Sequence, residues 1–145
     1  MKACLRAALL SILLPVAACG PADTPGISLD LDGKLQGQWV VINYWAIWCK
    51  PCAHEIPELN ALAELAGVSV LGVNFDGASG AELAEQEQKL GINFPTLQID
   101  PALQLGVPRP VVLPTTLVIA PDGQLRETLV GPQTLESLAA ATGQR

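Results

Sequence analysis

Cys49 and Cys52 are the residues of this chain whose types and spacing most directly suggest chemistry. Two cysteines separated by two residues can form a disulfide across one turn of a helix, or can supply half of a metal site. The chain has no second pair with this spacing, and His54 is its only histidine, so a zinc site with four ligands cannot be completed. The pair therefore predicts thiol–disulfide exchange, without a metal or another cofactor.

The residues on either side of the pair predict the elements that position it. Residues 39–45 are a continuous apolar, β-branched and aromatic run, typical of a strand buried on both faces. Pro51 suits the first turn of a helix, and apolar residues then recur at helical spacing until Gly67. Cys49 is thus expected at a helix N-terminus, where unpaired N–H groups and the helix dipole favour a thiolate over a thiol with a pKa of ~8.5.

The rest of the chain predicts a βαβ unit followed by a ββα unit. Further strands are expected at 68–75, 115–119 and 124–130, and further helices at 79–90 and 132–142. An order of strand, helix, strand, helix, strand, strand, helix indicates an α/β domain. The predicted architecture is a central mixed β-sheet flanked by helices on both faces.

This order, together with three short motifs, resembles the thioredoxin fold over residues 39–142. Residues 45–52 are similar to the W-A-x-W-C-x-x-C segment of the thioredoxin superfamily, and residues 113–116 are similar to its cis-proline element. Residues 55–57 resemble the C-x-x-E-x-P signature of the TlpA/ResA-like thiol–disulfide oxidoreductases. Asn43, which stands where thioredoxins proper have a buried aspartate, also favours this branch.

Helix position and resemblance together imply the roles of three residues. Cys49, at the helix start and nearer to solvent in this fold, is the expected nucleophile. Cys52, one turn further in, is expected to resolve the mixed disulfide. Glu55 lies on the same side of the helix as Cys52. If buried, its carboxyl would have a raised pKa and could relay a proton to or from Cys52. The alternative is a surface glutamate stabilised by the helix dipole.

The resemblance also implies a substrate-binding surface. Pro114 would be cis and would face the two cysteines, leaving the backbone of Leu113 free to pair with a client strand. The alternative for Pro114 is an ordinary trans proline that precedes a strand. Trp48, next to Cys49, is expected on the docking surface. The loop at residues 107–113 is a few residues longer than is usual for this family, which leaves the choice of partner open.

The N-terminal residues predict export and lipidation. A short basic start is followed by an apolar run of roughly a dozen residues, which suits a secretory signal and is too short to span a membrane. Residues 16–19 resemble a bacterial lipobox, in which Cys19 would be acylated. The alternative is an ordinary signal peptide that is cleaved elsewhere. The expected organisation is a lipoprotein signal peptide at 1–18, a tether at 19–26 and a thioredoxin-like domain at 27–145.

Composition limits the classes of partner. Half of the residues are hydrophobic, enough for one compact core, and the formal net charge is −6. Without Lys2 and Arg6 of the leader, 6 basic residues remain against 14 acidic ones, a net charge of −8. No basic patch is left that could neutralise phosphates, so nucleic acid is not an expected partner.

Taken with the resemblance, these features predict a monomeric thiol–disulfide oxidoreductase anchored to a bacterial membrane and facing the periplasm. It would reduce selected protein disulfides, as in cytochrome c maturation or copper-oxidase assembly, with electrons from a membrane thiol transporter. A copper-handling module of thioredoxin-like fold is the alternative, although Sco-like proteins have three residues between their cysteines and a distant histidine. A peroxidase would need Thr or Ser where this chain has Ala46.

Overall fold

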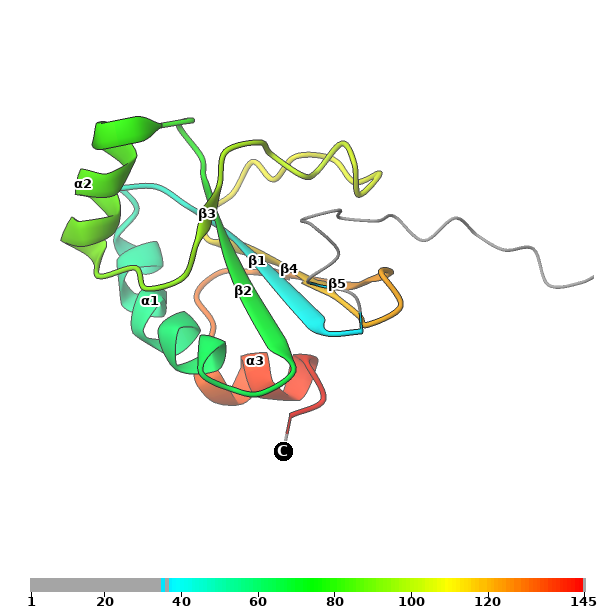
Figure 1. Cartoon of the computed structure of the whole chain (residues 1–145). Coiled ribbons are helices and arrows are strands. Elements are labelled where there is room, and N and C mark those ends of the chain that lie inside the picture. Colours follow the sequence, from blue (N-terminus) through cyan, green and yellow to red (C-terminus); the bar gives the residue numbers. More distant parts are fainter. Residues whose placement is uncertain (1–34, 36, 145) are drawn as a thin grey trace, which may run out of the picture.

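A five-stranded mixed sheet, in the order β3-β2-β1-β4-β5, forms the centre of the domain (Figure 1). The computed structural model describes residue 35 and residues 37–144. The elements in chain order are β1 (Trp39–Trp45), α1 (Lys50–Ala63), β2 (Val68–Asn74), α2 (Gly80–Leu90), β3 (Thr96–Leu97), β4 (Thr115–Ile119), β5 (Leu125–Val130) and α3 (Leu135–Ala141). Strand β1 pairs in parallel with β2 and antiparallel with β4, and this mixed arrangement confirms the predicted fold class.

Most predicted boundaries hold to within one residue, but the start of α3 and the presence of β3 differ from the prediction. Helix α3 begins at Leu135 rather than at residue 132, because Thr134 acts as its N-cap. The Thr134 hydroxyl accepts a hydrogen bond from the Ser137 N–H, and the Ser137 hydroxyl accepts one from the Thr134 N–H, which satisfies two unpaired donors of the first turn. Strand β3 was not predicted, since its two residues are too few to show a period.

The two faces of the sheet are covered differently. On one face, Val41 of β1 packs against Ile56 and Leu59 of α1 and Leu138 of α3. On the other face, the β1 cluster is covered by residues 98–113, a segment of turns and irregular backbone that contains no helix or strand (Figure 1). Helices therefore flank the sheet as expected, but turns replace the helix that we predicted on the second face.

Alternation along β1 brings adjacent residues to opposite faces. Ile42 and Tyr44 belong to the cluster under the 98–113 segment, whereas Val41 and Trp45 pack with the helices and the residues around the cysteines. This is the period of two expected of a strand. Asn43, between them, faces the α1 side, where it contacts Glu55.

Gly72 of β2 provides the space in which the Trp45 indole lies. A Cβ atom at Gly72 would lie 2.8 Å from both Trp45 Nε1 and Thr96 Oγ1, which is too close for any real side chain. The Trp45 side chain is fully buried and shares a cluster with Cys49 and Cys52. A glycine at this position is therefore needed to support the floor of the cysteine site.

The predicted signal peptide at 1–18, the tether at 19–26 and the lipidation residue Cys19 lie outside the described residues. The helices that the structure does describe are all too short or too polar to cross a bilayer.

Candidate active site

Cys49 and Cys52 form a disulfide at the N-terminus of α1, with their Cα atoms 5.3 Å apart. Cys49 is the N-cap of the helix, and its sulfur accepts a hydrogen bond from the Cys52 N–H at 3.2 Å. Both side chains are buried in this oxidised form, with Cys49 4% exposed and Cys52 1% exposed. In the reduced form, the same N–H group and the helix dipole would stabilise a thiolate on Cys49.

Glu55 is buried one turn further along α1, with 1% of its surface exposed. The Asn43 amide donates to Glu55 Oε2 at 3.3 Å and to Thr116 Oγ1 at 2.9 Å, and the Thr116 hydroxyl donates to Glu55 Oε1 at 3.4 Å. Burial raises the pKa of Glu55 to about 7, although hydrogen bonds from the Gln133 backbone, Asn43 and Thr116 oppose this rise. The surface-glutamate alternative is thereby excluded.

The Glu55 carboxyl makes no hydrogen bond to Cys49 or Cys52. Within the described residues, its polar partners are Asn43, Thr116 and Gln133, and neither sulfur is among them in this disulfide form. All of these partners are uncharged. The carboxyl can therefore change protonation near neutral pH without breaking an ion pair.

The loop before β4 also reaches the cysteines. The Leu113–Pro114 peptide bond is cis, and the Leu113 side chain packs against the cluster that contains Cys49 and Cys52. The Pro114 carbonyl accepts from the Gly131 N–H at 2.9 Å. The Leu113 backbone, by contrast, makes no hydrogen bond with any residue that the structure describes. A free backbone group beside the disulfide is available to pair with an extended chain.

Trp48 lies at the surface beside the disulfide, with 62% of its area exposed. Its indole Nε1 donates to Asp76 Oδ2 at 2.8 Å, and its ring meets the Phe75 ring edge-on, with centroids 6.4 Å apart. These contacts fix the orientation of a large exposed aromatic group. His54, also on α1, is exposed.

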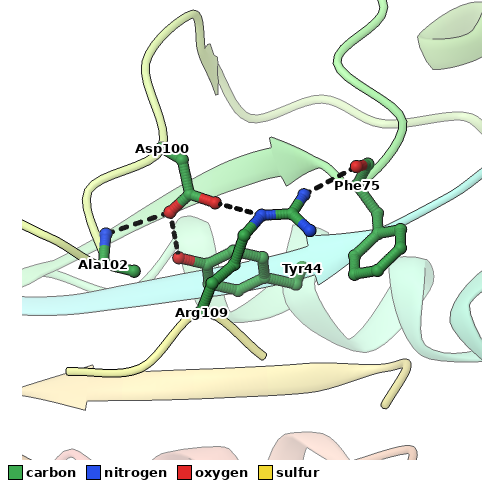
Figure 2. A network of polar contacts seen from close by, with 5 residues as sticks. All are labelled: Tyr44, Phe75, Asp100, Ala102 and Arg109. Atoms are coloured by element: carbon green, nitrogen blue, oxygen red, sulfur yellow. Dashed lines mark hydrogen bonds and ion pairs between the residues drawn. The ribbon is translucent and has the colours of Figure 1, made fainter. Parts of the chain in front are cut away.

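The structure brings one further group of residues near the site that the sequence did not predict (Figure 2). The Tyr44 hydroxyl donates to Asp100 Oδ1 at 2.6 Å, and Arg109 Nε donates to Asp100 Oδ2 at 2.7 Å. Arg109 Nη2 also donates to the Phe75 carbonyl at 2.6 Å, and its guanidinium lies 4.3 Å from the Phe75 ring centroid. Asp100 also accepts a hydrogen bond from the Ala102 N–H, within a turn. This bond is local enough to be predicted from the sequence, whereas the other contacts of the group are not.

The charges in this network reinforce one another. Burial alone would raise the pKa of Asp100, but hydrogen bonds from Tyr44, Ala102 and Arg109, with the Arg109 charge, hold it below its ordinary value. Burial and the bond to Asp100 raise the pKa of Tyr44, so its hydroxyl stays protonated and donates. Asp100 is therefore a fixed anion under the 107–113 loop.

Comparisons with known proteins agree with this geometry. A model of the AhpC/TSA family matches residues 21–128. The thiol–disulfide oxidoreductase ResA of Bacillus thuringiensis (strain Al Hakam) is 34% identical over 119 residues, which cover 75% of this chain and 68% of ResA. The thiol:disulfide interchange protein HelX of Rhodobacter capsulatus is 34% identical over 119 residues, which cover 78% of this chain and 62% of HelX. The crystal structure of a DsbF homologue from Corynebacterium diphtheriae has a TM-score of 0.63 at 25% identity, and the match covers 74% and 71% of the two chains.

The family match spans most of the chain, including all of the residues around the disulfide. The chain belongs to the AhpC/TSA family. Within that family it is a ResA-like thiol–disulfide oxidoreductase of thioredoxin fold, since the relatives that match it carry that activity in their names. The match ends before α3, the helix that packs beside α1.

The Cys49–Cys52 disulfide is the candidate chemical centre of this domain. Among residue 35 and residues 37–144, no three His, Cys, Asp or Glu side chains are close enough together to hold a metal ion. The site thus offers a disulfide at a helix N-terminus, a buried carboxyl with a pKa near neutrality, and an exposed aromatic group next to Cys49.

Proposed function

We propose that this oxidoreductase reduces selected protein disulfides while held at a bacterial membrane and facing the periplasm. The observation that carries the proposal is Cys49 at the N-cap of α1, bonded to Cys52, with its sulfur accepting a helix N–H. Similarity to ResA and HelX supports the exchange chemistry. The clients belong, in this proposal, to cytochrome c maturation or copper-oxidase assembly, and a membrane thiol transporter supplies the electrons.

The proposed reaction begins with the reduced protein. The Cys49 thiolate attacks one sulfur of the client disulfide, which forms a mixed disulfide and releases the other client sulfur as a thiolate. Cys52 then attacks the Cys49 sulfur and releases the second client thiolate. The client gains two electrons and becomes a dithiol, and the Cys49–Cys52 disulfide is the oxidised product.

Glu55 moves the proton of Cys52 in this proposal. The Cys52 thiol must lose a proton before it can attack, and it regains one when the transporter reduces the disulfide. A carboxyl with a pKa of about 7 can accept and return that proton at neutral pH. Its burial on the same side of α1 as Cys52 supports transfer once the disulfide opens.

Client docking involves three residues around the disulfide. The free Leu113 backbone would pair with an extended client segment, next to Pro114 and beside the cysteines. Trp48 would cover the apolar part of that segment, a role supported by its exposure and fixed orientation. Both features leave the sulfur of Cys49 as the group that the client disulfide approaches.

Single cysteine variants test the assigned order of attack. Cys49→Ala is expected to abolish reduction of a protein disulfide, whereas Cys52→Ala should accumulate mixed disulfides that non-reducing electrophoresis detects. Cys4→Ala, in the predicted leader, is a matched control and should leave turnover unchanged. Equal residual turnover in the Cys49 and Cys52 variants would contradict the two roles.

The direction of electron flow is tested by an anaerobic redox titration of the Cys49/Cys52 pair. A potential near or below ~−250 mV is expected of a reductant, because protein reductants of this fold are strongly reducing. A value near ~−120 mV would make the protein an oxidant and overturn this part of the proposal.

The membrane anchor rests on Cys19, with residues 1–18 removed as a signal peptide and residues 19–26 acting as a tether. Acyl chains contribute ~0.8 kcal/mol per buried methylene, so several chains anchor a protein stably. Cys19→Ser should release the protein from the membrane fraction. A variant that still sediments with membranes would contradict lipidation at Cys19.

A further inference from the structure

The 107–113 loop presents apolar side chains to solvent. Val111 is 87% exposed and Val112 is 53% exposed. Both valines are close in sequence to Leu113, whose backbone we expect clients to use, so their exposed side chains extend the proposed docking surface with apolar groups. The loop is fixed at its end, since the Thr115 hydroxyl donates to the Val112 carbonyl at 2.7 Å.

Arg109 fixes the other end of the loop. Its guanidinium uses Nε for Asp100 and Nη2 for the Phe75 carbonyl, so one side chain joins the 107–113 loop to two other segments (Figure 2). Asp100 is in turn held by the hydroxyl of Tyr44, a fully buried residue of β1. Through this chain of bonds, the exposed loop is attached to the central sheet.

Phe75 extends the same connection to the active site. One aromatic ring receives the Arg109 guanidinium at 4.3 Å and meets the exposed Trp48 ring edge-on. Phe75 and Leu113 both pack against the cluster that contains Cys49. Through Phe75, the Arg109 side chain therefore links the loop that carries the two valines to the tryptophan beside the disulfide.

We propose that Arg109 is a positioning residue that holds the 107–113 loop beside Trp48, so that Val111 and Val112 form an apolar rim for the client. The substrate class that fits this rim is a polypeptide disulfide with aliphatic residues next to its cysteine. The inference rests on the proposed function and adds which clients are preferred. Arg109 acts through the loop and takes no part in the exchange of sulfurs.

Lysine could not replace arginine fully in this role. The planar guanidinium donates to Asp100 and to the Phe75 carbonyl from two different nitrogens while it stacks on a ring. A lysine ammonium is a single point that can keep the ion pair but not all three contacts. Arg109→Lys is therefore an intermediate variant, which separates the effect of geometry from the effect of charge.

The test compares two synthetic peptides that share one intramolecular disulfide, flanked by Val-Leu in one peptide and by Ser-Ser in the other. Arg109→Ala should raise the KM for the Val-Leu peptide about fivefold, the loss expected when one well-packed interface contact is removed. The kcat should change less than the KM, and the KM for the Ser-Ser peptide should change little. Arg109→Lys should fall between Arg109→Ala and the wild type.

Two controls keep a structural effect apart from a positioning effect. Arg126→Ala removes an exposed arginine of β5 and should leave both KM values unchanged. The double variant Val111→Ser, Val112→Ser keeps Arg109 and should raise the KM for the Val-Leu peptide alone. The reduction potential of the Cys49/Cys52 pair should be the same in all of these variants.

The possible failures are distinguishable. If the wild type does not reduce either peptide, or does so without Cys49, the proposed function is wrong. If the wild type reduces both peptides and Arg109→Ala leaves the ratio of their KM values unchanged, only the inference about Arg109 is wrong. An equal rise in both KM values, or a changed reduction potential, would likewise overturn selection by the apolar rim.

Discussion

Glu55 and Asp100 are both carboxylates bonded to β1, through the adjacent residues Asn43 and Tyr44, but they lie on opposite faces of the sheet. Glu55 is 1% exposed and has only uncharged partners. The Asp100 side chain is 28% exposed and pairs with the charged Arg109. The pKa of Glu55 is raised to about 7 and that of Asp100 is lowered.

Both carboxylates accept several hydrogen bonds, so the number of bonds does not explain the opposite shifts. Burial dominates at Glu55, where no cation offsets the cost of removing a charge from water. At Asp100, the bonds from Tyr44, Ala102 and Arg109 outweigh the effect of burial. One carboxyl can therefore exchange a proton at neutral pH, and the other stays charged and anchors a loop.

The largest expected effect comes from Glu55→Gln, followed as the pH dependence of the free energy of unfolding. The folded protein keeps a proton on Glu55 up to a pKa of about 7, whereas the unfolded chain releases it near the ordinary 4.5. The wild type should therefore lose stability as pH rises through this window, by on the order of 3 kcal/mol. Glu55→Gln should not show this loss, and urea unfolding between pH 4 and 8.5 would measure the difference.

Glu64→Gln is the matched control for this experiment. It makes the same chemical change at the exposed C-cap of α1, so its pH dependence should run parallel to that of the wild type. A wild-type curve that rises between pH 5 and 7 relative to Glu55→Gln would contradict a raised pKa.

Thr116→Val should give the next largest effect. It keeps the shape of the side chain but removes the hydroxyl that accepts from Asn43 and donates to Glu55. The buried Asn43 amide and the buried Glu55 carboxyl each lose a hydrogen-bond partner. The free energy of unfolding should therefore fall by about 2 kcal/mol. The pKa of Glu55, measured by carbon NMR of its carboxyl, should rise further. Thr128→Val, on the exposed strand β5, is the control and should change neither quantity.

Tyr44→Phe should have a smaller effect on the opposite face. The ring still fills its place in the core, but Asp100 Oδ1 keeps only the Ala102 N–H as a donor. The free energy of unfolding should fall by about 1 kcal/mol, less than for a fully buried carboxylate because water can reach Asp100. The pKa of Asp100 should rise. An unchanged pKa of Asp100 would mean that Ala102 and Arg109 hold it down without Tyr44.

The sequence was sufficient to place the disulfide and its supporting elements, because the signals for them are local. An apolar strand, a proline in the first helical turn and helical spacing after Cys52 together put Cys49 at the start of α1. Asn43 carries a second signal besides the one that favours the TlpA/ResA-like branch. A polar residue in the middle of a buried strand must find a partner, and here the partners are Glu55 and Thr116.

The second face could not be predicted in the same way. Its cover is a segment of turns, whose position depends on long-range bonds such as that between Tyr44 and Asp100, 56 residues apart. Asp100, the partner of Arg109, is only nine residues away in sequence. Loops and turns have no regular repeat, however, so this spacing does not predict that the two side chains meet. Side-chain pairs of this kind emerge only when the fold is known.

Asp100→Asn should have the smallest effect on the free energy of unfolding at pH 7. Its effect should change with pH in the acid range, whereas that of Glu55→Gln changes between the ordinary carboxyl pKa and neutral pH. The loss of the ion pair should cost less than 1 kcal/mol, since Arg109 and Asp100 are 44% and 28% exposed and solvent screens them. The folded pKa of Asp100 is lowered, so its stabilisation is present above the ordinary pKa of 3.8 and is lost as pH falls through the folded value. The two unfolding curves should therefore converge in acid, and 1 M salt should bring them closer at pH 7. Curves that diverge in acid would mean that the folded pKa of Asp100 is raised, as that of Glu55 is, and the contrast between the two faces would be lost.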